Sequence, residues 1–427
     1  MFKRKAAIIG AGSTYTPELV EGFLARRESL GFDDVTLMDI DGERLEIVGG
    51  LAKRQFAAGG FSGDVLLTTD LSAALAGASF VFVQARVGKM PARILDERIP
   101  LKYGMLGQET TGAGGFMKAL RTLPVMMDLA EHMERLAAKG AWLINFTNPS
   151  GIIAEMLQNM SGINMVGLCN CAVNMVKGVA DTISTDDFDY EYVGLNHLSW
   201  ITSVVRRGER ENIAPRLVDK AGASMNNVPD IDYDPALLRA VPYIPSPYLS
   251  YFYERERQLR KCLDAERTRG EICLELEERL LDMYKDADLA VKPKELEKRG
   301  GALYSTAALS VADAIINDKK ERHVVAVKNN GAVPFMDDDD VVEVLCTLGK
   351  TGAVPLAVRE SNGYIVGLMR AVKAYEKLTV RAALDGDRDA ALAALMAHPL
   401  IGDCAKAKPM LDEMIEANKE HLPRFFA

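Results

Sequence analysis

Cysteine and histidine side chains that could bind a metal ion occur in two short polar segments, Cys169-Asn170 and Asn196-His197. By ligand type alone, a thiolate paired with an imidazole would favour zinc. Each residue also has an ordinary interpretation, because free cysteine is among the most buried residue types and a single histidine can lie hydrogen-bonded in a core. The residue types alone leave both a metal site and simple packing open.

An arginine, Arg93, offers a second kind of chemistry. Its planar guanidinium donates paired hydrogen bonds and is suited to binding phosphate. The same residue could instead form a surface salt bridge with Asp96 or Glu97, which lie three and four residues along a predicted helix. The pattern does not decide between the two. Four consecutive acids at 337–340 are interpreted as a solvated loop and not as a metal site.

The N-terminal segment predicts an element that could position a nucleotide. Residues 5–9 form a short apolar strand that Gly10 and Gly12 close, and Thr16-Pro17-Glu18 predicts a helix start with Thr16 as N-cap. A strand, a glycine turn and a helix place backbone N–H groups where a pyrophosphate binds. Asp39 ends the next strand, where an acid binds the ribose of NAD and disfavours NADP. Tyr15 replaces the third glycine of the motif, so a plain turn remains an alternative.

Further buried strands are expected at 35–38, 80–83, 142–146 and 165–168, with helical stretches between them. This alternation predicts an α/β fold with an N-terminal Rossmann-like, doubly wound parallel sheet over residues 1–195. Ligands of such sheets bind at the carboxyl ends of the strands. We therefore expect the polar segments 84–89, 107–112, 145–149, 169–170 and 196–197 to meet there. Charged amphipathic stretches at 254–285 and 359–384 predict a mixed, mainly helical domain over residues 196–427.

Composition and charge exclude several classes of partner. The net charge of −9 argues against nucleic acid, which is bound by neutralising phosphates with Lys and Arg. No stretch of eighteen apolar residues predicts a membrane span. The six cysteines have no regular spacing, as expected in a reducing compartment. We expect a cytoplasmic protein.

Several strings together resemble glycoside hydrolase family 4, most closely its 6-phospho-β-glucosidase branch. They are Gly10-Ala11-Gly12-Ser13-Thr14-Tyr15-Thr16-Pro17-Glu18-Leu19, the segment 93–101, Gly107 to Thr110, Asn145 to Pro149, Gly194-Leu195-Asn196-His197 and Lys298-Arg299-Gly300-Gly301. The resemblance covers almost the whole chain. The NAD-dependent members of this family depart from the two-carboxylate scheme of glycosidases.

The resemblance implies a redox route to hydrolysis. Hydride leaves C3 of the sugar to NAD, a base removes the C2 proton, the aglycone is eliminated from C1, water adds and the hydride returns. Cys169 and His197 match the ligands of a divalent metal, usually Mn²⁺, and Tyr248 matches the C2 base, with Tyr251 and Tyr253 as close alternatives. A phenol with a pKa of about 10 needs activation, which a nearby cation supplies.

The resemblance also assigns binding residues and partners. Ser13, Thr14 and Asn145 join Gly10, Gly12 and Asp39 at the NAD site, and the substrate residues are Arg93, Asn148, Asn170 and, as a helper, Arg299. Asn170 is also assigned to the catalytic positions. In α-selective relatives this position is typically Asp, which can help protonate the departing oxygen, whereas an amide cannot act as a general acid. The resemblance therefore implies a preference for β-linked substrates. The expected substrates are phosphorylated disaccharides or aryl glycosides, and the expected assembly is a homodimer or homotetramer.

The chain departs from the family at one place. The family commonly has an aliphatic residue and Pro where this chain has Cys171 and Ala172. On an extended strand Cys171 would face the same way as Cys169, and we favour packing for it over metal binding.

Two alternative functions remain. An NAD-dependent dehydrogenase of a small hydroxy acid would share the N-terminal fold, but it normally pairs a His base with an Asp, and no such constellation is evident. A non-catalytic NAD-binding sensor would not need Cys169, His197 and Tyr248 together.

Overall fold

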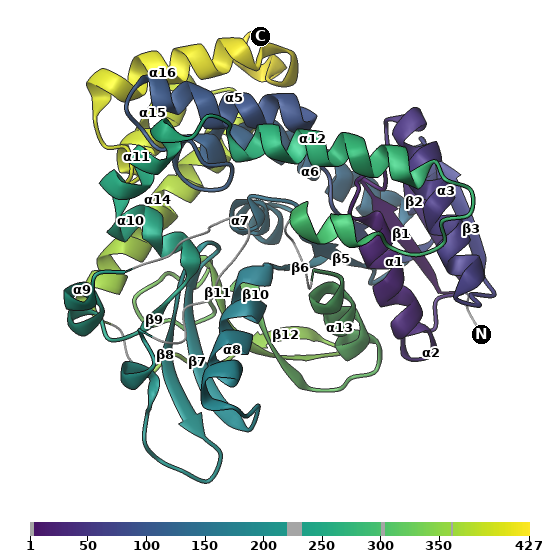
Figure 1. Ribbon diagram of the computed structural model, residues 1–427, viewed down its shortest axis with the longest axis horizontal. Helices are drawn as coiled ribbons and strands as arrows, with labels where there is room; N and C mark the ends of the chain where they lie inside the picture. The colour runs from purple at the N-terminus through teal and green to yellow at the C-terminus, as the bar shows by residue number, and fades with distance from the viewer. Residues whose placement is uncertain (1–3, 220–232, 300–303, 360–361) are drawn as a thin grey trace.

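The computed structural model describes residues 4–219, 233–299, 304–359 and 362–427, which form one twelve-stranded sheet with helices on both faces (Figure 1). Its N-terminal half is parallel, and the strand order 3-2-1-4-5-6 is that of a dinucleotide-binding fold. These strands are β3 (Asp64–Thr68), β2 (Asp34–Met38), β1 (Lys5–Ile9), β4 (Ala78–Val83), β5 (Trp142–Asn145) and β6 (Asn164–Gly167).

The sheet continues beyond β6 as antiparallel strands. β10 pairs with β6, β11 pairs with both β10 and β7, and β8 and β9 extend the sheet beyond β7. The bounds are β10 (Glu321–Lys328), β11 (Val341–Gly349), β12 (Gly352–Pro355), β7 (Phe188–Leu195), β8 (Leu198–Arg206) and β9 (Ile244–Pro245). The predicted boundary after residue 195 falls at the β7–β8 turn, so the two predicted domains share one continuous sheet.

The helices of the N-terminal half alternate with its strands along the chain. They are α1 (Thr16–Ala25), α2 (Arg27–Leu30), α3 (Gly42–Ala58), α4 (Leu71–Leu75), α5 (Lys89–Lys102), α6 (Gly112–Leu136), α7 (Ser150–Met160) and α8 (Asn170–Ile183). Because the chain runs outward from β1 in both directions, its crossover helices cover opposite faces. Thus α1 and α3 pack together, and α6 and α7 pack together.

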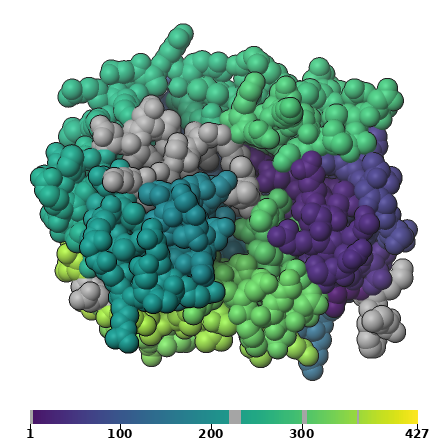
Figure 2. All heavy atoms as spheres, turned by 60° about the horizontal axis from the view of Figure 1, so that its bottom comes forward, coloured from purple at the N-terminus to yellow at the C-terminus, as the bar shows by residue number. Residues whose placement is uncertain are grey.

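The later helices complete both layers. They are α9 (Pro235–Ala240), α10 (Ser250–Tyr253), α11 (Arg255–Asp264), α12 (Arg269–Tyr284), α13 (Tyr304–Ile316), α14 (Gly363–Asp385), α15 (Arg388–Ala397) and α16 (Cys404–Ala417). In Figure 1, α13 lies near α1, and α12 runs beside α5. Figure 2 shows α12 (green) against the N-terminal elements (purple), where Leu280 and Tyr284 of α12 pack on Val48 and Leu51 of α3.

One predicted helix boundary was wrong. The N-cap of α1 is Tyr15, and Thr16 is already helical; its hydroxyl donates to the Ala11 carbonyl (2.8 Å) and does not cap the helix. The charged amphipathic stretch 254–285 is helical, as expected for this half, and contains two helices, α11 and α12. Thr268 caps α12 by accepting from the Glu271 N–H, while the Glu271 carboxylate accepts from the Thr268 N–H. This reciprocal capping box starts a new helix.

The described residues contain no helix that is both long and apolar enough to cross a membrane. Burial instead follows the layers of the fold: the parallel strands β1, β2 and β4 are apolar and almost fully buried, as expected for strands covered on both faces. The polar segments that follow these strands are therefore held on a rigid edge.

Candidate active site

The glycine turn and the acid after β2 lie together, as predicted. The Gly12 N–H donates to Asp39 Oδ2 (2.8 Å), and a Cβ at Gly12 would lie 2.8 Å from that oxygen. Gly10 has φ +83°, and a Cβ there would lie 2.9 Å from the Ala85 backbone. A side chain at either position would therefore push the turn away from its neighbours.

Arg299 lies against the same turn. Its guanidinium stacks 4.6 Å from the centre of the Tyr15 ring, and its Nη2 donates to Glu277 (2.6 Å). The side chain is buried, yet its Nε and Nη1 have no partner among the described residues. Buried donors are normally hydrogen-bonded. An anionic ligand beside Tyr15 would satisfy these two groups.

Cys169 and His197 come together from different elements. Cys169 follows β6 and caps α8, accepting from the Cys171 N–H (3.4 Å). His197 lies in the turn between β7 and β8 with φ +63°, and its Nε2 is 3.5 Å from Cys169 Sγ. Both side chains are only 4% exposed.

The donor geometry fits one divalent ion. A sulfur at 2.3 Å and a nitrogen at 2.0–2.1 Å around a tetrahedral ion lie roughly 3.5 Å apart. A hydrogen bond from the Cys171 thiol and the neighbouring His197 hold the pKa of Cys169 well below its usual range, which favours the thiolate that binds metals. Within the described residues, no third His, Cys, Asp or Glu ligand atom lies within 4.8 Å of both. A metal ion held by this pair would take its other ligands from substrate or water oxygens or from residue types other than these four.

The extended strand expected at Cys171 was wrong, because this residue is helical, but its thiol does lie beside that of Cys169. It belongs to the first turn of α8 and packs in an apolar cluster with Ala172 and Met175. Its thiol donates to Cys169, and this bond and burial raise the pKa of Cys171. These contacts support the packing interpretation that the sequence favoured.

Tyr248 lies directly against the metal-ligand candidate. It belongs to a short 3₁₀ helix (Pro247–Leu249), and its buried ring is centred 4.2 Å from that of His197. Of the two alternatives, Tyr253 accepts a hydrogen bond from the Trp200 indole (2.7 Å), and Tyr251 lies behind Tyr248 with a ring separation of 6.4 Å. Burial raises the pKa of both alternatives.

Arg93 forms one of the salt bridges considered from the sequence, but this salt bridge is buried and does not lie on the surface. The predicted partner Glu97 accepts from Nε (2.8 Å), but the pair is 94% buried, and Nη1 also contacts Glu109 (3.1 Å). The other candidate partner, Asp96, pairs with Arg121. Three cations surround Glu109, because Arg86 (2.7 Å) and Lys118 (3.2 Å) contact it as well.

Glu109 lies among three basic side chains, and Glu97 beside Arg93 is the second acid of this cluster. Burial alone would raise the pKa of Glu109, but Arg93, Lys118 and Arg86 bring it well below its usual range. Burial, reinforced by the charge of Arg86, lowers the pKa of Lys118 to about 7. A buried group of this kind can bind an anion such as a phosphate.

Three of the predicted polar segments line one cavity. Its wall includes Thr110 and Thr111, Pro149 and Gly151, and Asn196 and His197, and is completed by the rings of Phe252, Tyr375 and His398. Asn148 precedes Pro149 through a cis peptide bond. Asn145 instead uses its side chain within the turn, donating to the Thr147 carbonyl (3.1 Å) and accepting from the Thr147 N–H (3.1 Å).

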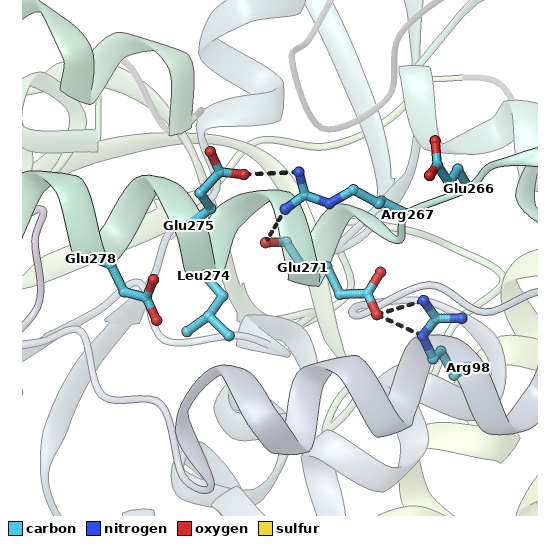
Figure 3. A pocket seen from close by; sticks show the side chains of 7 residues that line it. All are labelled: Arg98, Glu266, Arg267, Glu271, Leu274, Glu275 and Glu278. Carbon is cyan, nitrogen blue, oxygen red and sulfur yellow. Dashed lines mark hydrogen bonds and ion pairs between the residues drawn. The ribbon is translucent and has the colours of Figure 1, made fainter.

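A second concave surface lies on the outside of α12 (Figure 3). Its ion pairs join Arg98 of α5 to Glu271 (2.5 Å) and Arg267 to Glu275 (2.8 Å). The Arg98–Glu271 pair holds the start of α12 on α5, where the Gly270 N–H reaches Glu97 (2.7 Å). This surface positions the partner of Arg93 and adds no new chemistry of its own.

The acids at 337–339 are exposed, as expected for a solvated loop, but Asp340 is buried and accepts from the Asp337 N–H (2.9 Å). Asp337, Asp339 and Asp340 offer oxygens within 4.8 Å of one another, but Lys377 lies among them, with its Nζ 2.6 Å from Asp340 Oδ1. Asp337 and Asp339 are exposed.

Comparison with known proteins identifies the family. Residues 5–185 match the family model described as family 4 glycosyl hydrolase, and residues 192–401 match the one described as its C-terminal domain. The chain belongs to glycoside hydrolase family 4. It is 42% identical to the probable 6-phospho-β-glucosidase of Bacillus subtilis (99% of this chain, 98% of that protein) and 37% identical to the 6-phospho-β-glucosidase of Escherichia coli (99% and 97%).

A solved structure of the same family superposes closely. The 6-phospho-β-glucosidase of Thermotoga maritima with manganese, NAD⁺ and glucose 6-phosphate has a TM-score of 0.88 and 34% identity, covering 98% of this chain and 99% of that one. The Rossmann-like fold expected from the sequence is therefore confirmed.

The sequence analysis missed Glu343 in this family 4 chain. Glu343 is 3% exposed, and burial, together with the Cys169 sulfur, raises its pKa to about 8. One signal could have found it: a single acid stands in the otherwise apolar strand Val341–Gly349. Lys118 was missed because only the tertiary fold brings it to Glu109.

Proposed function

We propose that this enzyme hydrolyses 6-phospho-β-glycosides with NAD and a divalent metal, Mn²⁺ or a similar ion. The observation that carries the proposal is the meeting of Cys169, His197 and Tyr248 at one buried point, with a ligand pair 3.5 Å apart and the tyrosine ring 4.2 Å from the imidazole. Similarity over the full length to 6-phospho-β-glucosidases supports it.

The bound cofactors would supply reversible hydride removal at C3, by NAD, and polarisation of the oxygens on C2 and C3, by the metal. Tyr248 removes the C2 proton, which the C3 ketone has made acidic. The C1–O bond then breaks and the aglycone oxygen takes up a proton; water adds its oxygen to C1 and a proton returns to C2, and the hydride held by the cofactor would restore C3. Cys169 and His197 hold the metal, while Asn170 at the start of α8 hydrogen-bonds the sugar.

The remaining residues bind the two ligands. Gly10, Gly12, Ser13 and Thr14 would hold the NAD pyrophosphate and Asp39 its ribose, with Asn145 shaping the neighbouring turn. For the substrate, Arg93 and Asn148 would bind the 6-phosphate and hydroxyls. Arg299, whose Nε and Nη1 have no partner among the described residues, would be a further phosphate ligand.

The proposed setting follows the sequence expectations. The chain would work as a homodimer or homotetramer in the cytoplasm, on phosphorylated disaccharides or aryl glycosides, and sedimentation of the purified protein tests the assembly. The proposed division of labour is an NAD-binding domain over residues 1–195 and a substrate, metal and oligomerisation domain over residues 196–427.

The test is aglycone release from p-nitrophenyl β-glucoside 6-phosphate with NAD and Mn²⁺. We expect many equivalents of nitrophenol per NAD and no net NADH, because the hydride returns in each turnover. Accumulation of NADH without nitrophenol would support a dehydrogenase instead. Release of neither product would favour an NAD-binding protein without catalysis.

A further inference from the structure

Glu343 is a buried carboxyl group behind the turn that carries His197. It lies in β11, where the register places it opposite Gly194 of β7. Both of its oxygens are used: Oε1 accepts from the Tyr192 hydroxyl (2.9 Å), and Oε2 accepts from Asn196 Nδ2 (3.0 Å). The proposed reaction gives this residue no role.

The two hydrogen bonds of Glu343 reach both sides of His197. Asn196 directly precedes the histidine. On the other side, Glu343 binds the hydroxyl of Tyr192. This hydroxyl is 2.6 Å from the hydroxyl of Ser199, which lies two residues after the histidine. One carboxyl group thus braces the β7–β8 turn before and after the metal-ligand candidate.

Asn196 also joins this turn to the substrate turn. Its Oδ1 accepts from the Gly151 N–H (3.2 Å) in the first turn of α7, just after the Asn148-Pro149 bond. A Cβ at Gly151 would lie 2.7 Å from the Asn196 Cβ, so the contact requires glycine. The position of Asn196 therefore sets the spacing between His197 and Asn148.

The backbone of His197 is itself strained. Its φ of +63° lies in the left-handed region, which residues other than glycine adopt at a cost of about 1–2 kcal/mol and mostly in turns. Pairing of Leu195 with Leu198 closes this turn, and the bonds of Asn196 and Tyr192 hold its two ends.

We propose that Glu343 is a positioning residue that fixes His197, through Asn196 and Tyr192, in the geometry that binds the metal. Groups behind metal ligands orient them, and their loss typically weakens metal binding by about tenfold to a hundredfold. The inference rests on the proposed metal site at Cys169 and His197. It differs from a purely electrostatic role, in which the charge of Glu343 would attract the cation.

The experiment measures the Kd for Mn²⁺ from the electron paramagnetic resonance of free Mn²⁺, with NAD and glucose 6-phosphate present. We expect Glu343→Ala to raise the Kd by about tenfold to a hundredfold. Glu343→Gln should stay within about threefold of wild type, because its amide can accept from Asn196 and donate to Tyr192. An unchanged Kd in Glu343→Ala overturns the proposal, and so does a Gln variant as weak as Ala, which would indicate charge.

Glu155→Gln is the matched control. Glu155 is equally buried and braces the same strand, accepting from the Val341 N–H (2.8 Å) and Lys373 (2.7 Å), with no bond to Asn196. It should lower the melting temperature without changing the Kd. Equal weakening in the control and in Glu343→Ala would show general destabilisation and overturn the proposal.

A double-variant cycle tests the path through Asn196. Removing Glu343 from an Asn196→Ala background should weaken Mn²⁺ binding much less than it does in wild type, because contacting residues couple. Full additivity contradicts positioning through Asn196. Failure of the wild-type protein to bind Mn²⁺ at all would overturn the metal site, and the role of Glu343 with it. Binding that is equal in wild type and Glu343→Ala overturns only the latter.

Discussion

Replacing Arg93 by alanine separates substrate recognition from stability. The guanidinium is 5% exposed and bridges Glu97 (2.8 Å) and Glu109 (3.1 Å). Breaking a buried ion pair costs 3–5 kcal/mol when the partner is stranded. Here each carboxylate keeps a donor, Gly270 N–H for Glu97 (2.7 Å) and Arg86 for Glu109 (2.7 Å). We therefore expect Arg93→Ala to lower the free energy of unfolding by about 3 kcal/mol, the lower end of that range.

The loss of phosphate binding appears in a different quantity. If Arg93 binds the 6-phosphate, its removal costs at least 2 kcal/mol of substrate binding, and at about 3 kcal/mol the preference for phosphorylated substrate falls about a hundredfold. The assay is the ratio of kcat/KM for p-nitrophenyl β-glucoside with and without the 6-phosphate, measured well below the melting temperature. This ratio cancels any loss of folded enzyme.

A matched control is Arg121→Lys. Arg121 is a buried arginine of α6 that grips Asp96 of α5 with two hydrogen bonds (2.8 and 2.6 Å), and the lysine keeps the charge but loses the fork. It should cost stability and leave the ratio unchanged. A wild-type ratio in Arg93→Ala would refute the reasoning and move phosphate recognition to Arg299.

The remaining predictions concern the metal, the anomer and acid stability. Chelation should abolish activity and Mn²⁺ restore it, with Cys169→Ser inactive at trace metal; full activity of this variant would remove Cys169 from the metal site. Because Asn170 cannot donate a proton as a general acid, β-linked 6-phosphoglucosides should be cleaved much faster than α-linked ones, and equal kcat/KM values for the two p-nitrophenyl anomers would show that Asn170 does not report the anomer. Burial lowers the pKa of His398 to about 3, and the unfolded chain binds one more proton between that value and about 6.5. The free energy of unfolding therefore falls by about 1.4 kcal/mol for each unit that the pH falls through this window. His398→Asn, which can still accept from the Leu400 N–H, should remove that slope in urea unfolding between pH 6.5 and 4.5, and an unchanged slope would show that His398 is not its source.

Local chemistry explains what the sequence could predict. Gly10, Gly12 and Asp39 end neighbouring parallel strands, so strand pairing alone brings the turn and the acid together. The same rule placed Cys169 at the edge of the sheet.

Errors arose where local patterns were misjudged. Cys171 was treated as part of an extended strand, although α8 begins at Asn170, directly after Cys169, and turns its side chain into an apolar cluster. Within the amphipathic stretch 254–285, the start of α12 is marked by Thr268 and Glu271, three residues apart, which form its capping box.

Other features depend on distant parts of the chain. Arg93 is buried because α12 and the segment with Glu109 close over it, and Glu343 reaches Asn196 only through the pairing of β11 with β7. No pattern within a short window contains either contact.

The most direct test of the redox mechanism is the isotope at C2 of the product. Hydrolysis of p-nitrophenyl β-glucoside 6-phosphate in D₂O, with NAD and Mn²⁺, is followed by mass spectrometry and proton NMR of the glucose 6-phosphate formed. If Tyr248 removes the C2 proton and the solvent replaces it, the product carries deuterium at C2, and Tyr248→Phe greatly slows this exchange. A product that retains its C2 proton while nitrophenol is released would show direct displacement at C1 and contradict the account.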